Sequence, residues 1–382
     1  MNHGRLDTGA ASSSNQAIDD EATGSVTHMQ AVTESVTESV TVVICNYNYG
    51  RYIAEAIDSA LAQTRRPARV LVIDDGSTDD SVEVVRRYGA AVELLRKENG
   101  GQVSAYNTAV ELLDTEIVIF LDADDFLYHE AVAQVMACFA DPRLAKVQYR
   151  LDIFSSGGDP TGSQIPNSRP PRDCGPSLRK GWLYPSPPAS GNAYRVANLR
   201  RIYPIREPLH SKYGADFYAI YGIALTGEVG SIDRALGGYR THAPNLRADK
   251  ARDISFANAA KWKETPQEFL RRWTLLSTLA ASRLGIALPA ELNDYSYTKS
   301  VFVAELYGRP FLPRARWLLR GSPRYFRSIL INPYWGWRKK LALVAISLCC
   351  FVPGQRLSDE VVRFIANPLS RRRFLPGGRP AS

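Results

Sequence analysis

The chain has 382 residues, of which 45% are hydrophobic and 23% charged, and this composition is ordinary for a folded protein. At roughly 100 to 200 residues per domain, that length accommodates one sizeable α/β domain with an accessory region. The five cysteines are scattered without a Cys-x-x-Cys pair, which argues against a disulfide framework or a zinc site and is typical of a reducing compartment.

The two ends of the chain differ in character. Residues 1–39 are rich in Ser, Thr, Asn and acids, so we predict a disordered tail that lacks the apolar core of a signal peptide. The net charge of +8 originates at the other end, where residues 311–382 contain fourteen Lys and Arg against two acids.

Between these ends, short apolar segments alternate with helical patterns. We predict strands at residues 40–44, 70–73, 91–95 and 117–121, each followed by a polar loop and a helix. This alternation predicts βαβ units in a mostly parallel sheet with flanking helices. Right-handed crossovers would bring all four loops to one edge of that sheet.

The fourth strand runs directly into three carboxylates, Asp122, Asp124 and Asp125. Ligands of open α/β sheets bind outside the carboxyl ends of the strands, and in an extended chain Asp122 and Asp124 would point to the same side. Such a pair suits a hard divalent cation. The alternative is that Asp124 or Asp125 caps the helix that begins near Tyr128.

Polar side chains also follow the first two strands. Asp74 and Asp75 end the second strand, although their Asp-Gly turn and the capping-box spacing of Ser77 also suit a simple helix start. The first strand is followed by Asn46, Tyr47 and Asn48. Together these loops predict a pocket with an aromatic shelf and with acceptors for a base or a ribose. No glycine-rich phosphate loop is present, so we expect a metal to hold the phosphates.

The second half of the chain shows weaker patterns. Residues 155–190 are rich in Pro, Gly and Ser, which predicts a long surface loop and a candidate lid over the site. Beyond residue 247 the pattern is helical.

Several strings, in their order and spacing, resemble the successive motifs of family 2 glycosyltransferases. The strings are VVICNYN at residues 42–48, VIDDGS at 72–77, NGGQ at 99–102, FLDADD at 120–125, SGNA at 190–193, GAD at 214–216 and YRTHAPN at 239–245. The resemblance covers about residues 40–246 and implies a GT-A-type, Rossmann-like α/β fold. We therefore expect a catalytic domain at residues 40–250, with a nucleotide-binding half at 40–130 and an acceptor-binding half at 131–250. The helical pattern and the basic charge beyond it predict a helical, basic C-terminal region at 251–382.

The resemblance also implies roles for individual residues. The residues expected to bind a nucleotide sugar are Asn46, Tyr47, Asn48, Asp74, Asp75, Gly101, Asp122 and Arg240. Of these, Asp122 would contact the ribose and Arg240 would clamp the diphosphate. Asp124 would ligate Mn²⁺ or Mg²⁺, with His242 as a further ligand. Asp216 stands where the family has its catalytic base, which would remove the proton of an acceptor hydroxyl as that hydroxyl attacks and inverts the anomeric carbon.

Two of these residues have alternative interpretations. Asp216 could cap a helix that starts near Phe217, and His242 could be a surface histidine. The sequence also departs from the usual family pattern, with Cys45 and Asn46 where Pro-Thr is frequent, Tyr106 where Arg is frequent and Ala215 where Glu is frequent. Residues 267–273 resemble the QxxRW signature of processive synthases with the wrong spacing, so we expect transfer of single sugars.

The basic C-terminal end contains an apolar run at residues 341–352, preceded by aromatics and by Arg338, Lys339 and Lys340. The run is shorter than the ~20 residues that span a bilayer. It predicts a helix lying in the interface of an anionic membrane, and the alternative is a terminal helix packed on the catalytic domain. Specific nucleic-acid binding is not expected, because a basic surplus alone supports only nonspecific phosphate contacts.

We therefore expect a metal-dependent, inverting glycosyltransferase, peripheral on the cytoplasmic face of the cell membrane. It would pass one sugar from a nucleotide-diphosphate sugar to a lipid-linked or polysaccharide acceptor. One alternative is a sugar nucleotidyltransferase, whose first loop is rich in Gly and Arg where this one reads NYNY. The other is a sugar-nucleotide-binding or glycan-binding protein without turnover.

Overall fold

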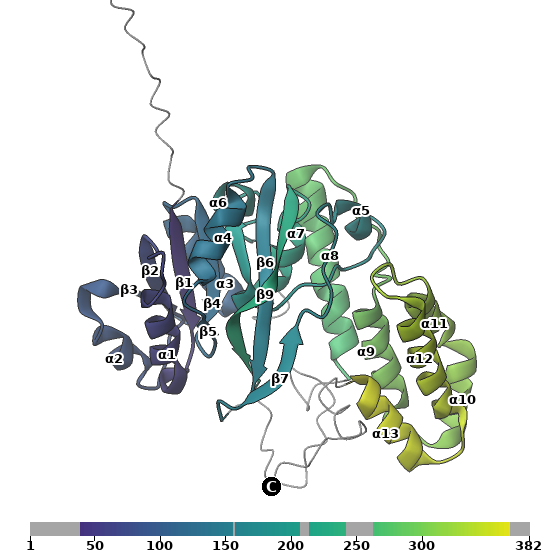
Figure 1. The fold of residues 1–382 in the computed structure, drawn as a ribbon. Coiled ribbons are helices and arrows are strands. Elements are labelled where there is room, and N and C mark those ends of the chain that lie inside the picture. The colour runs from purple at the N-terminus through teal and green to yellow at the C-terminus, as the bar shows by residue number, and fades with distance from the viewer. Residues whose placement is uncertain (1–38, 156, 207–213, 242–262, 367–382) are drawn as a thin grey trace, which may run out of the picture. The chain divides into compact units, whose positions relative to one another are not determined.

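The computed structural model describes residues 39–155, 157–206, 214–241 and 263–366 (Figure 1). These residues belong to one unit, Glu38–Ser382. The predicted N-terminal tail, except for Ser39, and His242 lie outside the described residues.

Within the described chain, nine strands form one mixed sheet in the order β3-β2-β1-β4-β8-β6-β9-β5, with β7 paired to β6. Its first half is parallel, as the alternating pattern predicts, and consists of β1 (Val40–Asn46), β2 (Arg69–Asp74), β3 (Glu93–Arg96) and β4 (Ile117–Asp122). The second half consists of β5 (Phe126–Leu127), β6 (Leu144–Phe154), β7 (Pro160–Ile165), β8 (Asn192–Arg195) and β9 (Glu228–Arg240). There β8 runs antiparallel between β4 and β6, whereas β6 and β9 are parallel to each other.

The helices of the sheet region follow the strands. They are α1 (Gly50–Leu61), α2 (Ser81–Arg86), α3 (Gln102–Leu112), α4 (Ala131–Phe139), α5 (Gly175–Leu178), α6 (Val196–Leu199) and α7 (Ala215–Ile223), with 3₁₀ turns η1 (Gly89–Ala91) and η2 (Ala189–Gly191). In α4 the apolar residues Val132, Val135, Met136 and Phe139 are buried, at the spacing of one helix face. The third strand begins at Glu93 rather than at residue 91, because residues 89–91 form η1.

The segment at residues 155–190 is not the long surface loop that its Pro, Gly and Ser content predicts. It contains β7, α5 and η2, and Leu178 and Tyr184 are completely or almost completely buried. The buried Lys146 of β6 also donates hydrogen bonds from Nζ to the Tyr184 hydroxyl (3.2 Å) and to Ser186 Oγ (2.8 Å). Apolar and polar anchors thus hold the segment against the sheet, although its prolines interrupt regular structure.

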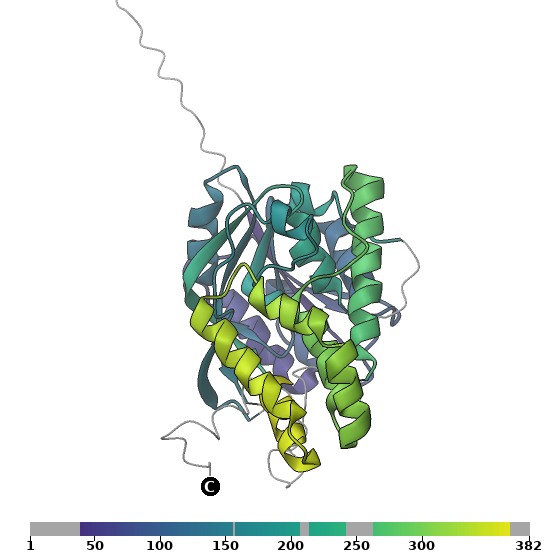
Figure 2. The ribbon, with the colours of Figure 1, turned by 90° about the vertical axis from the view of Figure 1, so that its right-hand side faces the viewer.

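The C-terminal region is helical, as expected (Figure 2). It consists of α8 (Thr265–Leu284), α9 (Tyr295–Leu306), α10 (Phe311–Arg320), α11 (Pro323–Leu330), α12 (Trp337–Leu348), η3 (Cys349–Phe351) and α13 (Gln355–Ala366). Helix α8 has Pro266 in its first turn and ends at the left-handed Gly285, which are favoured residues at those positions. The later helices share their own core around Phe302, Tyr325 and Ile329. None of the helices in the described ranges is long and apolar enough to cross a membrane.

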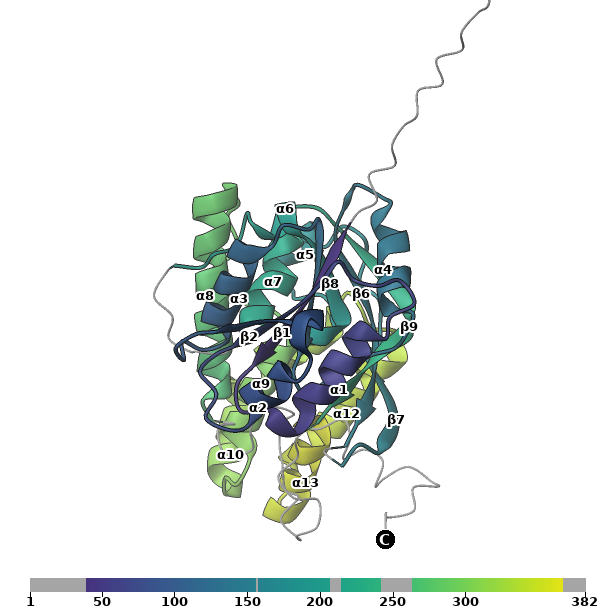
Figure 3. The same ribbon diagram turned by 90° about the vertical axis from the view of Figure 1, so that its left-hand side faces the viewer.

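Helices cover both faces of the sheet, and Figure 3 shows the two layers edge-on. Side chains alternate along β1, so Val42 and Ile44 join the core beneath α1 and α4, whereas Val43 joins the core beneath α3, α7 and α8. Such double coverage explains why the parallel strands are apolar without alternation. The polar loops therefore lie at the ends of the strands, outside the two helical layers.

Candidate functional site

The first strands of the sheet end level with one another. In the parallel register Asn46 lies beside Asp74, and Cys45 lies beside Asp122. The carboxyl ends of β1, β2 and β4 therefore meet at one edge, where the sequence placed its candidate residues.

The loops after β1 and β2 are braced against each other. Asn46 Nδ2 donates to Asp74 Oδ1 (2.9 Å) and to Ser77 Oγ (3.0 Å), while the backbone amide of Ser77 donates to Asp74 Oδ2 (3.1 Å). Asn48 has a positive φ of 60°, and its Oδ1 accepts from the Thr78 amide at 2.8 Å. Asn46 Oδ1 is buried and finds no hydrogen-bond partner within the described residues. This oxygen is an acceptor that a bound donor group could satisfy.

Asp75 ties the third loop to the second. Its Oδ1 accepts from Lys97 Nζ (2.6 Å) and the Gly100 amide (3.0 Å), and its Oδ2 accepts from the Gly101 amide (2.7 Å). Gly101 has a φ of +84°, which favours glycine. Asp74, Asp75 and Gly101 thus organise the loops, and their contact with a nucleotide stays a prediction. Tyr47, in contrast, does not brace the loops in this way, because the residue is 45% exposed.

Asp125 does not cap the helix that follows it, so that alternative is wrong for this residue. Helix α4 begins only at Ala131, without a side-chain cap. Asp125 is buried and accepts hydrogen bonds from Ser190 Oγ (2.6 Å) and from the backbone amide of Arg240 (2.8 Å). It therefore joins the acidic loop, which we define as residues 122–125, to η2 and to β9.

The acidic loop and Asp216 form an electrostatic cluster. Burial, with repulsion from Asp124 and Asp216, raises the pKa of Asp122 well above its usual range. Burial likewise raises the pKa of Asp216, against the opposing attraction of Arg272 and Lys146. The effect of Asp216 on Asp122 places the carboxylate of α7 within electrostatic range of the end of β4, and the catalytic role of Asp216 stays a prediction.

Asp216 lies in the first turn of α7 but does not cap it. The cap position is occupied by Gly214, whose φ is +92°, and Asp216 Oδ1 accepts from the next backbone amide at 2.9 Å. A Cβ atom on Gly214 would lie 2.7 Å from the guanidinium carbon of Arg272 on α8. The positive φ therefore favours glycine at this position, and a larger residue would also displace the guanidinium of Arg272.

Gln102 is a residue of this site that sequence reasoning missed. Its Oε1 accepts from the backbone amides of Gly214 (2.8 Å) and Ala215 (3.1 Å), which are orphan donors at the start of α7. The residue belongs to the NGGQ string, but nothing in that string pointed to a contact 112 residues away. Gln102 thereby anchors the turn that carries Asp216.

Arg240 is brought to the acidic loop. Its guanidinium is buried, with Nη1 donating to the Asp124 carbonyl (2.8 Å) and Nη2 to Glu55 Oε2 (2.8 Å). The guanidinium also lies 4.8 Å from the centre of the Tyr52 ring. In this arrangement Arg240 fixes the backbone of the loop, and its contact with a diphosphate stays a prediction.

The donor chemistry of the acidic loop fits a hard divalent cation. Asp122 and Asp124 repel each other, and a bound cation would stabilise both in their ionised form. Carboxylate oxygens are the usual ligands of Mg²⁺ and Mn²⁺. Among the described residues, however, no three His, Cys, Asp or Glu side chains are arranged to hold a metal. The predicted second ligand, His242, is not among them.

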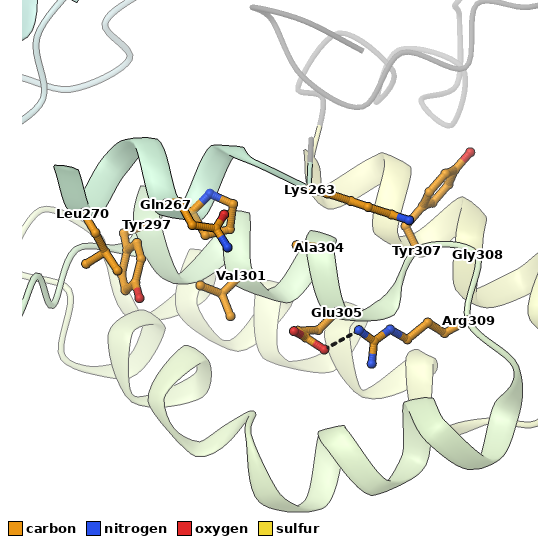
Figure 4. A pocket seen from close by; sticks show the side chains of 11 residues that line it. Lys263, Gln267, Leu270, Tyr297, Val301, Ala304, Glu305, Tyr307, Gly308 and Arg309 are labelled. Atoms are coloured by element: carbon orange, nitrogen blue, oxygen red, sulfur yellow. Dashed lines mark ion pairs between the residues drawn. The ribbon is translucent and has the colours of Figure 1, made fainter. Parts of the chain in front are cut away.

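A separate pocket of about 490 Å³ lies between α8 and α9 (Figure 4). Its lining includes Gln267, Tyr297 and Tyr307, and Figure 4 shows Glu305 and Arg309 pointing toward one another as an ion pair of 2.8 Å. None of the predicted site residues lines this pocket. It is therefore distinct from the site at the strand ends.

Comparisons with known proteins agree with this architecture. Residues 41–197 match the model of the Glycosyl transferase family 2. An uncharacterised glycosyltransferase of Nostoc sp. is 33% identical over 318 residues, which are 80% of this chain and 92% of the relative. Chondroitin synthase of Pasteurella multocida is 35% identical over 131 residues, which are 34% of this chain and 13% of the synthase.

Among solved structures, the mannosyltransferase PcManGT from Pyrobaculum calidifontis, in complex with GDP-Man and Mn²⁺, is similar with a TM-score of 0.47 and 19% identity. That alignment covers 90% of this chain and 89% of the mannosyltransferase. The family match and the near-full-length similarity to the Nostoc protein show that this chain is a glycosyltransferase and belongs to family 2.

Proposed function

We propose that this glycosyltransferase moves a single sugar from a nucleotide-diphosphate sugar to a hydroxyl of a lipid-linked or polysaccharide acceptor, with inversion and with a divalent metal. The observation that carries the proposal is the level register of β1, β2 and β4, which brings Asn46, Asp74 and Asp122 to one edge of the sheet, and Asp216 contributes to the raised pKa of Asp122 there. A base and a metal-binding carboxylate must both lie near one anomeric carbon, and these observations support that arrangement.

The donor nucleoside would lie over the loops after β1 and β2. The unsatisfied Asn46 Oδ1 supports this assignment, because a nucleobase N–H or a ribose hydroxyl would supply its missing donor. The exposed ring of Tyr47 offers a stacking surface, and Asp122 would accept from the ribose. Asp74, Asp75, Asn48 and Gly101 would act mainly by holding these loops in place.

Asp124, with His242, would hold Mn²⁺ or Mg²⁺. When bound, the metal would stabilise the negative charge that develops on the departing diphosphate. Arg240 would contribute positive charge to the same group if its guanidinium turned from Glu55.

Asp216 would act as the general base toward the acceptor hydroxyl. Its burial supports this role, because a carboxylate whose pKa lies above its usual range accepts a proton more readily. Arg272 and Lys146 oppose this rise in the pKa of Asp216, because positive charge favours the ionised carboxylate.

The acceptor would extend toward the pocket between α8 and α9. Gln267 and Leu270 of this pocket precede Arg272 on α8, so the pocket begins within about 8 Å of Arg272 along the helix axis. Tyr297 and Tyr307 offer aromatic surfaces for sugar rings. We further propose a peripheral position on the inner face of the cell membrane and no specific nucleic-acid partner.

The test is turnover with a panel of nucleotide-diphosphate sugars and Mn²⁺, measured as release of nucleoside diphosphate and as product size. Asp216→Asn should lower kcat by about 10² to 10⁴ without loss of donor binding in a thermal-shift assay. Asp124→Asn should abolish the Mn²⁺-dependent thermal shift. The control is Asp114→Asn, because Asp114 is an exposed aspartate that pairs with Arg69.

Each rival predicts a different result. A sugar nucleotidyltransferase would release pyrophosphate from a nucleoside triphosphate and a sugar phosphate. A binding protein would show donor-induced thermal shifts without turnover. Full activity of the Asp216→Asn enzyme would overturn the choice of base, and long polymeric products would overturn transfer of single sugars.

A further inference from the structure

Helix α12 exposes an apolar stripe. Trp337, Leu341 and Leu348 are 66%, 54% and 48% exposed, and Ala345 between them is also exposed. Spacings of four, four and three residues keep these four side chains on one face of a helix. We call this set the α12 stripe.

The opposite face of α12 packs against the helical core. Leu343 and Ser347 are buried there, and Ser347 Oγ lies 2.9 Å from the Tyr325 hydroxyl. A surface helix in water normally presents polar residues outward, whereas α12 is apolar on both faces. Figure 2 shows α12 on the near side of the C-terminal helices, with no other described element in front of it. A contiguous exposed apolar surface of this kind marks an interaction site.

The positive charge of the segment that contains the α12 stripe indicates an anionic partner. Residues 311–357 contain nine Lys and Arg and no Asp or Glu. Arg338 and Lys339 are exposed at the start of α12, and the Arg338 guanidinium lies 5.5 Å from the Trp337 ring centre. An apolar stripe bordered by cations and a tryptophan is the pattern of a helix that lies in the interface of an anionic bilayer.

We propose that the α12 stripe docks on an anionic lipid surface, with α12 lying in the plane of the membrane. The helix has 12 residues and is about 18 Å long, so it would lie along the interface rather than cross it. A second copy of this chain is a poorer occupant, because two copies would bring like charges together. The docking deepens the peripheral membrane position proposed above and rests on it, but it does not depend on the transfer reaction.

The test is co-flotation of the full chain with lipid vesicles in the absence of any sugar donor. Vesicles of phosphatidylcholine with phosphatidylglycerol should carry the protein, whereas vesicles of phosphatidylcholine alone should carry much less. Binding should weaken as salt rises, because salt screens the attraction between cations and anionic lipids.

Two variants make the assay specific. Leu341→Glu combined with Leu348→Glu should lower binding to anionic vesicles by about tenfold or more, because it places charge in the α12 stripe. The matched control is Leu112→Glu, which changes an exposed leucine at the end of α3 and should bind as the wild type does. Circular dichroism would verify that both variants remain folded.

Three outcomes would overturn the docking proposal: absence of binding to anionic vesicles, equal binding of the double variant, or equal loss in the Leu112→Glu control. A dimer in sedimentation velocity that the double variant abolishes, without vesicle binding, would instead identify a self-association surface. Because no sugar donor is present, any of these results would leave the proposed reaction untouched.

Discussion

Gln102 offers a direct test of how the fold positions the candidate base. Its Oε1 accepts two backbone amides at the start of α7, from Gly214 at 2.8 Å and from Ala215 at 3.1 Å. Gln102→Ala would remove both bonds and leave two donors without their partner, which should lower the free energy of unfolding by roughly 1 to 3 kcal/mol. The first turn of α7, with Asp216, would then lose its anchor to α3.

The expected effect on catalysis follows from that displacement. A shift of about 1 Å in a reacting group costs about 10²-fold, so we expect kcat of Gln102→Ala to fall by about 10- to 100-fold with donor affinity unchanged. Initial rates at saturating donor and acceptor, together with donor titrations, would separate the two quantities. Wild-type kcat in Gln102→Ala would refute the reasoning.

A control and a conservative variant sharpen the test. Asn107 lies on the same helix and also makes two hydrogen bonds across the fold, to the carbonyl (2.8 Å) and the amide (2.7 Å) of Ile205. Asn107→Ala should therefore lower the free energy of unfolding by about as much as Gln102→Ala does, while leaving kcat largely intact. Gln102→Glu keeps an acceptor for α7 and adds a negative charge beside Asp216, so kcat should recover and its acidic limb should move to higher pH.

Three further predictions concern stability. Ser190→Ala removes the hydroxyl that bridges the acidic loop and should lower the free energy of urea unfolding by roughly 1 to 3 kcal/mol, and an unchanged midpoint would contradict the bridge. Gly214→Ala should lower the thermal unfolding temperature more than Gly285→Ala does. Both glycines have a positive φ, but only a Cβ at residue 214 would meet Arg272. Equal decreases in the unfolding temperature would show that this contact is unimportant. Burial raises the folded pKa of Asp294 to about 6, above its unfolded value of about 3.9, so its contribution to stability is complete below pH ~4 and is lost as pH rises to about 6. Asp294→Asn should remove that part of the pH dependence of unfolding, and an unaltered profile would argue against the raised pKa.

Local patterns predicted much of the nucleotide-binding half. The uncharged, β-branched segments before Asn46, Asp74 and Asp122 became parallel strands, because side chains buried on both faces permit little else. The alternation of strands and helices then required the three loops to meet at one edge.

Predictions from local composition failed where long-range packing determines the structure. Proline and glycine at residues 155–190 indicate only that regular structure is interrupted, whereas burial depends on side chains such as Tyr184 finding partners elsewhere in the chain. Asp125 looked like a helix start because Asp is a common cap. Its actual partners, Ser190 and Arg240, are 65 and 115 residues away.

The sequence by itself therefore determined the parallel half of the sheet, the edge at which Asp122 and Asp124 lie, and the family motifs, because each depends on local periodicity or on short strings. Only the tertiary structure decided that Gln102 holds the turn of Asp216 and that, among the described residues, the side chains on one face of α12 are exposed. Long-range hydrogen bonds leave no local periodicity in a sequence, and the burial of a helix face depends on which other elements pack against it.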